Sequence, residues 1–379
     1  MIVPFYDGNI EHCYETCYIL FLEGQMSKRR IKIGILTAGG DCPGLNAAIR
    51  GVGKTALLKY GCEIIGFSSG YLGLIRNEYK VLDERALSGI LTVGGTILGS
   101  SREKPFKSSE YDDYIKSKPE IIQENYKALG LDCLICIGGN GTQKTARRLQ
   151  KLGLNIIGIP KTIDNDVWGT DLTFGFDSAV SIAAEAIDRL HSTANSHKRI
   201  MVVEVMGHSA GWLTLYAGVA AGGDVILIPE IPYDSNLVAA YLNRRSKLGK
   251  PYSIVVVAEG IKLPKNTPDG EEFKSAGRYI SHEITRLTGM ESRETILGYI
   301  QRGGSPTARD RVVATELGAY AAEMIAREEF GKMAAYDGYQ LISVPLSEVA
   351  SALKTVPPDH PLISHARSID TCFGDQMPE

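Results

Sequence analysis

Short apolar runs rich in isoleucine, valine and leucine recur along this chain, and they alternate with stretches whose apolar residues have helical spacing. Such runs, when they are bounded by turn residues, are typical of buried strands. Strands that alternate with helices predict βαβ units and a mostly parallel sheet, which constrains the chain to an α/β fold. The expected strands lie at residues 31–36, 63–67, 133–137, 155–159, 200–205, 225–228 and 253–258.

Helices are expected between and after these runs. One of them, at residues 177–192, opens with a residue that can cap its first turn, Asp177. Its helical spacing places Val180, Ala183, Ala184 and Ile187 on one face. The full set of expected helices is 45–59, 141–151, 177–192, 211–220, 274–288 and 312–328.

Size and charge exclude several classes of protein. A chain of 379 residues is longer than one hydrophobic core usually serves, so we expect two lobes with a cleft between them. Hydrophobic residues make up 44% and charged residues 22%, as in an ordinary globular protein, and no membrane is needed to explain them. The formal net charge of −3 lacks the basic excess that most nucleic-acid binders use, so no nucleic-acid partner is expected.

The seven cysteines are scattered and odd in number, which argues against a disulfide framework and favours a reducing compartment, by default the cytoplasm. Cys133 and Cys136 form a C-x-x-C within an expected strand and are interpreted as core residues. Residues 1–28 lack the charge pattern of a signal peptide, and their apolar run is too short and too polar to span a membrane. We expect Met26 to be the natural start and residues 1–28 to be an N-terminal extension.

Glycine-rich or polar loops follow several expected strands, at residues 37–44, 138–142, 206–208 and 259–260. In open α/β sheets, ligands bind beyond the carboxyl ends of the strands. Two of these loops, around Gly39-Gly40 and Gly138-Gly139-Asn140-Gly141, also precede an expected helix, so their backbone can approach a phosphate closely. Together the loops indicate a phosphate or nucleotide site.

The run at residues 159–166 concentrates chemistry that suits phosphoryl transfer. It contains Lys161, Thr162, Asp164 and Asp166, directly after an apolar stretch. Carboxylates can take a proton from an alcohol or hold a metal ion, and an ammonium can neutralise a phosphate. The alternative is a polar turn without a function. The seven histidines show no metal-binding spacing, so a structural zinc is not expected.

These loops together resemble the phosphofructokinases, which phosphorylate fructose 6-phosphate at its 1-hydroxyl. The resemblance runs from about Ile31 to about Ala326 and keeps the motifs in order. They are residues 39–41, 94–96, 99–102, 138–142, 161–166, 205–208, 259–260 and 300–306. The resemblance implies two Rossmann-like α/β/α lobes with the active site in the cleft between them. The implied donor lobe is 29–175 plus 303–355, and the implied fructose 6-phosphate lobe is 176–302 plus 356–379.

By this resemblance, Asp164 is the general base that takes the proton of the sugar hydroxyl, and Thr162 and Asp166 position that hydroxyl. Arg102 and the backbone amide of Gly39 are implied to stabilise the transferring phosphoryl group. The implied nucleotide site also includes Ser101, Gly139, Asn140, Gly141 and Thr142.

The resemblance further implies a sugar-phosphate site formed by Arg199, Met206, Gly207, His208, Glu259, Arg293, Tyr299 and Arg302. In the family, the arginines that match Arg199 and Arg293 reach across from a neighbouring subunit, so a homo-oligomer is expected, a tetramer with a dimer as the alternative. Arg50 and Lys54 match basic effector-site positions of the bacterial enzymes, which implies allosteric control.

Three positions depart from the best-known bacterial pattern. Asn140 stands where an aspartate usually helps to bind the magnesium nucleotide, so a weaker contact to Mg²⁺ is expected there, with Asp164 as a further candidate ligand. Tyr299 replaces a histidine and His208 replaces an arginine among the residues that line the substrate.

Lys161 and Gly141 bear on the phosphoryl donor. Family members that use pyrophosphate have lysine at position 161 together with aspartate at 141. This chain has the lysine but also Gly141, which leaves space for the α-phosphate of ATP. ATP is therefore the expected co-substrate. The alternatives are a pyrophosphate-dependent enzyme and a non-catalytic sensor of sugar phosphate or nucleotide, although the intact Asp164 and Asp166 argue against a sensor.

Overall fold

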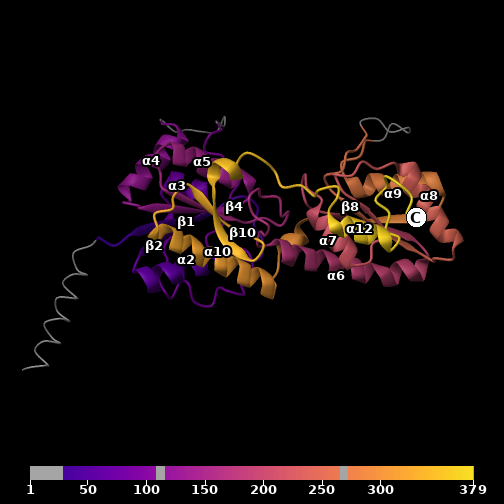
Figure 1. Cartoon of the computed structure of the whole chain (residues 1–379), viewed down its shortest axis with the longest axis horizontal. Coiled ribbons are helices and arrows are strands. Elements are labelled where there is room, and N and C mark those ends of the chain that lie inside the picture. The colour runs from indigo at the N-terminus through magenta and orange to yellow at the C-terminus, as the bar shows by residue number, and fades with distance from the viewer. Residues whose placement is uncertain (1–28, 108–115, 265–271, 379) are drawn as a thin grey trace, which may run out of the picture.

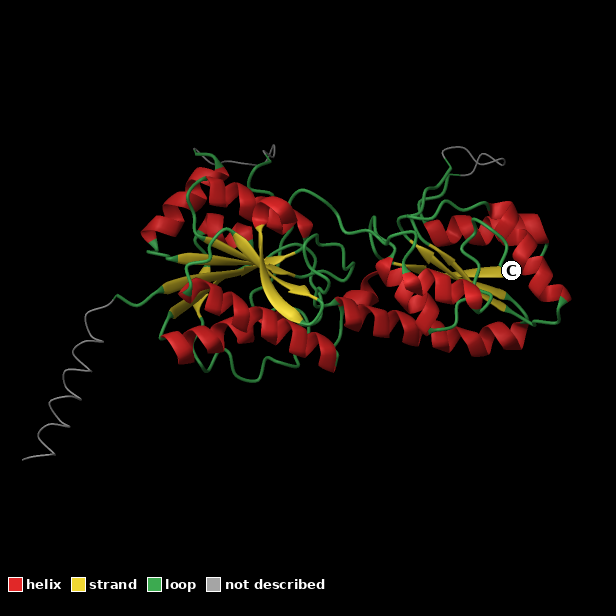
Figure 2. Cartoon of the chain, viewed as in Figure 1, coloured by secondary structure: helices red, strands yellow, loops and turns green. Residues whose placement is uncertain are grey.

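The computed structural model describes residues 29–107, 116–264 and 272–378. They form two α/β lobes that lie side by side along the long axis (Figure 1), each a sheet between layers of helices (Figure 2). The expected α/β fold with parallel sheets is therefore confirmed. The expected N-terminal extension, with Met26, lies outside the described residues.

The first lobe contains a seven-stranded sheet in the order β11-β10-β5-β4-β1-β2-β3. Its central strands are parallel, while β11 and β3 pair antiparallel to their neighbours at the two edges. The strands are β1 (Lys32–Thr37), β2 (Glu63–Phe67), β3 (Tyr79–Val81), β4 (Cys133–Gly138), β5 (Ile156–Pro160), β10 (Lys332–Asp337) and β11 (Gln340–Pro345).

Helices cover both faces of this sheet, because the central strands are apolar on both sides. Alternate residues of one strand, such as Ile135 and Cys136, enter separate core clusters on opposite faces. One face carries α2 (Leu45–Tyr60) and α10 (Ala308–Ala326); the other carries α3 (Tyr71–Arg76), α4 (Lys118–Ala128) and α5 (Asn140–Lys151), with the short α11 (Leu346–Val349) beside α5 (Figure 1).

Helices α2 and α10 approach each other closely through glycines. A Cβ at Gly51 would lie 2.6 Å from the carbonyl oxygen of Thr315, and a Cβ at Gly318 would lie 2.5 Å from that of Ala48. No side chain fits at either position without moving backbone, so these glycines set the distance between the two helices.

The second lobe contains a four-stranded parallel sheet in the order β7-β8-β6-β9. Its strands are β6 (Ile200–Val205), β7 (Val225–Leu227), β8 (Ser253–Ala258) and β9 (Ser292–Ile296). Helices α6 (Phe176–His197) and α7 (Trp212–Ala220) pack on one face, and α8 (Ser235–Lys247) and α9 (Ala276–Thr288) pack on the other. The 3₁₀ helix η1 (Gly298–Arg302) and α12 (Pro361–Ser368) complete the lobe.

The expected start of the long helix α6 was wrong. The helix begins at Phe176, and its N-cap is Gly175 with φ 98°, not Asp177. Asp177 lies in the first turn instead, where its Oδ2 accepts a hydrogen bond from Thr307 Oγ1 at 2.6 Å. A Cβ at Gly175 would lie 2.4 Å from Cys42 Sγ, so tertiary packing selects the glycine and determines where the helix starts.

Candidate active site

Three neighbouring strands of the first sheet bring the predicted loops together. Strands β5, β4 and β1 are adjacent and parallel, so the segments that follow them lie at the same edge of the sheet. These segments are residues 161–166 after β5, 139–142 after β4 and 38–41 after β1.

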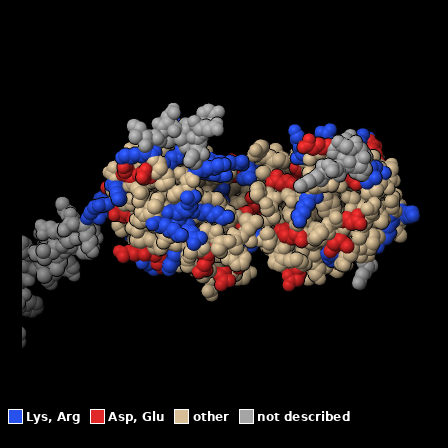
Figure 3. Space-filling view, turned by 90° about the horizontal axis from the view of Figure 1, so that it is seen from above, with Lys and Arg blue, Asp and Glu red and all other residues tan. Residues whose placement is uncertain are grey.

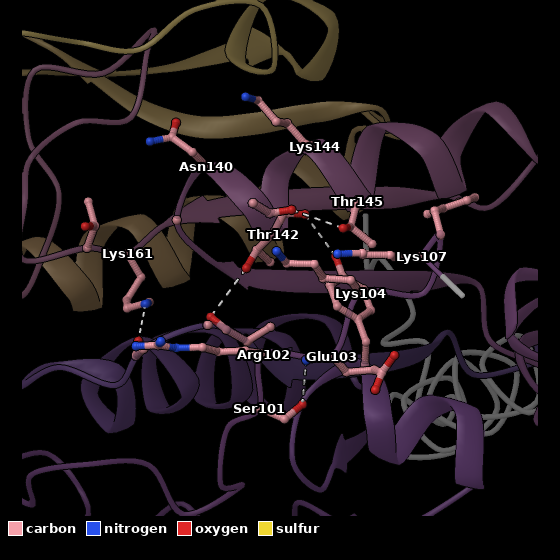
Figure 4. Close-up of a pocket in the computed structure, with 18 of the residues that line it drawn as sticks. Ser101, Arg102, Glu103, Lys104, Lys107, Asn140, Thr142, Lys144, Thr145 and Lys161 are labelled. Carbon is pink, nitrogen blue, oxygen red and sulfur yellow. Dashed lines mark hydrogen bonds between the residues drawn. The ribbon is translucent and has the colours of Figure 1, made fainter. Parts of the chain in front are cut away.

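A cavity of about 490 Å³ lies at this edge (Figure 4). All the residues predicted for catalysis and donor binding line it, together with Arg302 from the second lobe. The predicted residues are Gly39, Ser101, Arg102, Gly139, Asn140, Gly141, Thr142, Lys161, Thr162, Asp164 and Asp166.

Asp164 is the most perturbed acid in this cavity. Burial raises the pKa of its carboxyl to about 6, and the nearby carboxylate of Asp166 contributes to that rise. Its backbone amide donates to Thr162 Oγ1 at 3.0 Å, while its Oδ1 is buried without a hydrogen-bond partner among the described residues. A buried, partner-free carboxylate oxygen with a raised pKa is suited to accept a proton.

Asp166 is held by Asn140. The Nδ2 of Asn140 donates to Asp166 Oδ2 at 2.8 Å and to the carbonyl oxygen of Asp166 at 3.2 Å. Burial raises the pKa of the Asp166 carboxyl, and the hydrogen bond from Asn140 opposes that shift. The other side-chain atom of Asn140, Oδ1, is buried and has no hydrogen-bond partner among the described residues.

Lys161 is buried at the floor of the cavity, and burial lowers the pKa of its ammonium. Its Nζ donates to the carbonyl oxygen of Gly40, which links the loop after β5 to the loop after β1 (Figure 4). The same ammonium would lie 3.8 Å from a Cβ at Gly39. Lys161 therefore places a positive charge beside the glycine loop.

The backbone amide of Gly39, which the resemblance assigns to the transferring phosphoryl group, makes a hydrogen bond within the protein. It donates to the carbonyl oxygen of Ser101 at 2.9 Å, and the carbonyl oxygen of Gly39 accepts from Ser100 Oγ at 2.6 Å. Both backbone groups of Gly39 thus hold the loop of residues 99–102 in place. Donation from this amide to a phosphoryl group would require its bond to Ser101 to open.

The space beside Gly141 is open, because a Cβ built there has no neighbour within 4 Å. Beyond it, sequence reasoning missed several basic and aromatic residues of the cavity wall: Tyr71, Lys104, Phe106, Lys107, Lys144 and Arg148. Basic side chains gather over this lobe beside the hollow between the lobes (Figure 3). The Arg148 guanidinium lies 3.8 Å from the centre of the Phe106 ring.

The second lobe presents its own loops from two adjacent strands, β6 and β8. The Oε1 of Glu259 accepts from the amides of Gly207 at 3.3 Å and His208 at 2.9 Å, which holds Met206, Gly207 and His208 beside Glu259. The amide of Met206 donates to Gln301 Oε1 at 3.3 Å, and the adjacent Arg302 lines the donor cavity. These loops therefore lie on the side of the second lobe that faces the first.

Arg302 joins the two lobes at the cleft. Its Nη1 donates to the carbonyl oxygen of Asp41 at 3.1 Å, and it lines both the main cavity and a neighbouring cavity of about 470 Å³. Tyr299, which is 75% exposed, also lines this second cavity. The pair lies on the short helix η1, which follows β9.

Arg199 and Arg293 lie elsewhere. Arg199 precedes β6 and Arg293 is near the start of β9, whereas Met206 follows the end of β6. The six residues of β6 span roughly 20 Å at about 3.3 Å each, so these arginines lie at the opposite edge of the sheet from the cleft. There they share Glu291, with N–O distances of 2.8 Å from Arg199 and 2.5 Å from Arg293.

Comparison with known proteins identifies this arrangement. Residues 32–325 match the family model described as phosphofructokinase. The chain belongs to the phosphofructokinase family.

Two relatives resemble this chain over nearly their whole length. A Spirochaeta thermophila protein named ATP-dependent 6-phosphofructokinase is 58% identical over 90% of this chain and 97% of its own. A Bacteroides thetaiotaomicron protein named ATP-dependent 6-phosphofructokinase 3 is 57% identical over 91% of this chain and 100% of its own. The crystal structure of Pichia pastoris phosphofructokinase in the T-state is 30% identical with a TM-score of 0.77; the match covers 91% of this chain but only 37% of that longer one.

The described residues lack two further kinds of feature, a cluster of metal ligands and a membrane-spanning helix. Within residues 29–107, 116–264 and 272–378, no group of three or more histidine, cysteine, aspartate or glutamate residues is placed to hold a metal ion. In the same part of the chain, every helix is too short or too polar to cross a bilayer.

Proposed function

We propose that this chain is an ATP-dependent 6-phosphofructokinase, which transfers the γ-phosphoryl group of ATP to the 1-hydroxyl of fructose 6-phosphate and forms fructose 1,6-bisphosphate and ADP. The observation that carries the proposal is Asp164. Its buried Oδ1, which has no hydrogen-bond partner within the described part of the chain, belongs to a cavity that also contains the buried Lys161 and opens beside Gly141.

Asp164 takes the proton of the 1-hydroxyl as the oxygen attacks phosphorus. A base whose pKa lies just below neutral pH is ionised in the cell yet still basic enough to accept a proton. Asp166 and Thr162 position the sugar hydroxyl, and the hydrogen bond from Asn140 holds Asp166 in place. Lys161 and Arg102 line the cavity and supply positive charge to the phosphoryl group; the hydrogen bond of the Lys161 ammonium to the Gly40 carbonyl oxygen holds the first of these charges in place before the reaction begins.

The donor assignment rests on Gly141 and on the two relatives named as ATP-dependent. The open space at Gly141 supports passage of the α-phosphate of ATP, and the basic wall of Lys104, Lys107 and Lys144 suits a polyphosphate chain. Lys161 alone would also suit pyrophosphate, which is therefore the competing donor.

The residues present fit a magnesium ion. Oxygen ligands are what Mg²⁺ prefers, and Oδ1 of Asn140, which is buried and has no hydrogen-bond partner among the described residues, belongs to the lining of the donor cavity. Asn140 would hold the ion through this oxygen, and Asp164 would contribute only its second carboxylate oxygen, because its Oδ1 accepts the proton. When bound, the ion neutralises charge on the phosphates.

The second lobe supplies the sugar-phosphate site, with Met206, Gly207, His208, Glu259 and Tyr299 facing the donor lobe, and Arg302 between them. We place the boundaries of the two lobes where the sequence predicts them. The position of Arg199 and Arg293 at the far edge of the sheet supports their use by a neighbouring subunit, and a homotetramer is proposed. The five described cysteines are all free and buried, as in proteins of a reducing compartment, which supports the cytoplasm.

The test is a coupled assay on purified protein with fructose 6-phosphate, Mg²⁺ and either ATP or pyrophosphate. We expect turnover with ATP and little with pyrophosphate. Robust turnover with pyrophosphate alone would overturn the donor assignment. Absence of turnover with either donor, despite saturable binding of fructose 6-phosphate, would favour a sensor, and the Asp164→Ala variant would then behave like the unmodified protein.

A further inference from the structure

The segment of residues 350–356 crosses from the first lobe to the second beside the loop of residues 161–171, called the catalytic loop below because it contains Asp164 and Asp166. Leu353 forms an antiparallel bridge with Val167, and the Lys354 amide donates to the carbonyl oxygen of Asp166 at 2.9 Å. The returning chain is therefore attached to the catalytic loop at the residue that carries one of its two carboxylates.

The side chain of Lys354 makes three further bonds to the same loop. Its Nζ donates to Asn165 Oδ1 at 3.0 Å and to the carbonyl oxygens of Thr170 at 2.8 Å and Asp171 at 2.9 Å. An ammonium has three donors, so all of them are used within one loop. Such a complete set of charge-assisted bonds fixes the side chain and the loop relative to each other.

Lys354 also contacts the second lobe. Its carbonyl oxygen accepts from Trp212 Nε1 at 3.0 Å, and its Nζ lies 5.6 Å from the centre of the Trp212 ring. Trp212 is the first residue of α7. Lys354 thus links the catalytic loop to helix α7, which follows the loop of Met206, Gly207 and His208, called the sugar-phosphate loop below.

The bond to Asn165 falls at a left-handed turn of the loop. Asn165 has φ 49°, a conformation that asparagine adopts more readily than most other non-glycine residues, and its Oδ1 accepts hydrogen bonds from Lys354 Nζ and from Thr173 Oγ1. It lines a cavity of about 290 Å³ together with Lys354, while Asp164 and Asp166 on either side of it line the donor cavity. The turn at Asn165 therefore directs both carboxylates to the same side.

We propose that Lys354 is a positioning residue for phosphoryl transfer, which holds the turn at Asn165 so that Asp164 and Asp166 face the donor cavity in register with the sugar-phosphate loop. This inference rests on the proposed function. It goes beyond that function because Lys354 does not line the donor cavity. Its effect on the reaction is transmitted through its hydrogen bonds to the catalytic loop.

The test compares Lys354→Met with the unmodified enzyme, because methionine keeps much of the length of the side chain and removes its donors. We expect kcat to fall about tenfold to a hundredfold, as for a misplaced catalytic group, with the KM values for ATP and fructose 6-phosphate within about threefold. Lys250→Met, at an exposed loop of the second lobe, is the matched control and should keep kcat. A folded Lys354→Met enzyme with unchanged kcat, or with its loss confined to KM, would overturn the proposal.

A double-mutant comparison separates positioning from a general loss of stability. In the Asp164→Asn background the base is gone, so Lys354→Met should lower the residual rate by less than about threefold. Fully additive losses would show that Lys354 does not act through Asp164. Where Lys354→Met fails to fold, Trp212→Phe keeps an aromatic ring but deletes the bond to the Lys354 carbonyl, and it should lower kcat severalfold in the same direction; an unchanged kcat in that variant would overturn the link between the lobes.

The experiment also distinguishes this inference from the proposed function. Turnover of the unmodified enzyme is measured first with ATP and with pyrophosphate, and the variants are compared with whichever donor is used. An unexpected donor would therefore overturn the donor assignment alone.

Discussion

Asn140 donates its side-chain amide to Asp166 Oδ2 at 2.8 Å, at the start of the helix that borders the donor cavity. The amide satisfies one carboxylate oxygen without adding charge, while its own oxygen stays free of partners among the described residues. In the more familiar bacterial pattern an aspartate stands here, and it would place a second carboxylate against Asp166. Asn140 can therefore support Asp166 through its Nδ2 and bind a cation through its Oδ1.

Asn140→Asp should move the acidic limb of kcat/KM to higher pH, because the new carboxylate contacts Asp166 and adds negative charge to the cavity that also contains Asp164. It should also lower the Mg²⁺ concentration needed for half-maximal activity, since a carboxylate is a stronger ligand than an amide oxygen. A pH profile and a Mg²⁺ titration at fixed ATP measure both effects. Asn195→Asp, which adds the same charge on the exposed surface of α6, should change neither; an unshifted limb in Asn140→Asp would contradict the argument.

The pH dependence of the unmodified enzyme follows from Asp164. Its pKa is raised to about 6, chiefly by burial, and the base must be ionised to act. We therefore expect kcat/KM to be constant above about pH 7 and to fall about tenfold per pH unit well below about pH 6. Initial rates between about pH 4.5 and about pH 8.5 in buffers of constant ionic strength measure this limb. A limb centred near the ordinary aspartate pKa of about 4 would mean that Asp164 is solvated in the working enzyme.

Asp164→Asn should make the protein more stable while it removes activity. The folded-state pKa lies above the ordinary 3.8, so folding favours the protonated acid, and the ionised carboxylate destabilises the fold increasingly as pH rises from about 4 to about 6. A neutral amide avoids this cost, so Tm at about pH 7.5 should rise while kcat falls by about 10² to 10⁴. The gain in Tm should shrink at about pH 4.5; a lower Tm at both pH values would refute the electrostatic explanation.

Gly141→Asp should impair the use of ATP without harm to the fold. The Cβ finds open space on an exposed turn of α5, so Tm should change little, whereas the carboxylate would narrow the donor path and repel phosphate. We expect kcat/KM for ATP to fall at least about tenfold, since a like charge beside the phosphates costs a few kcal/mol. Gly141→Ala, which adds bulk without charge, is the control and should lose much less. Equal losses in the two variants would point to sterics alone.

Shared active sites can be tested by mixing two defective subunits. Asp164→Asn lacks the base and Arg293→Ala lacks an arginine from the far edge of the sheet. If each site takes its base from one subunit and the arginine from its neighbour, a random equal mixture should recover about a quarter of the intact sites. Co-expression of the two variants at equal levels provides this random mixture, and a different affinity tag on each variant shows that mixed oligomers have formed. Hybrids with no more activity than either parent would exclude sharing.

The strand-end loops could be predicted from sequence because a parallel strand and its loop are local features. The apolar runs that became β1, β4 and β5 are continuous, and the polar residues of 161–166 stand directly after one of them. Adjacency of these strands then follows from few topological choices. The cluster of Lys161, Asp164 and Asp166 could therefore be expected from the amino-acid sequence alone.

Other elements could not be predicted, for physical reasons. Strand β9 is Ser-Arg-Glu-Thr-Ile, an edge strand with mostly exposed side chains, and its sequence carries no apolar signal. The pair β10 and β11 was also missed, although the two-residue loop Gly338-Tyr339 has glycine, with φ 58°, at its first position, a preference of type II′ hairpin turns that could have revealed it. Contacts such as that of Gly39 with Ser101, or of Lys354 with Asn165, join residues distant in sequence and follow only from the packed fold.

The order of the strands has a consequence for synthesis on the ribosome. Strand β10, near the end of the chain, pairs with β5, and helix α10 covers α2, so the first lobe cannot complete its sheet until residues 176–302 of the second lobe have left the exit tunnel. Until then the apolar edge of β5 and one face of α2 are uncovered. The nascent chain is therefore expected to expose this apolar surface, a target for chaperones, while residues 161–337 are synthesised.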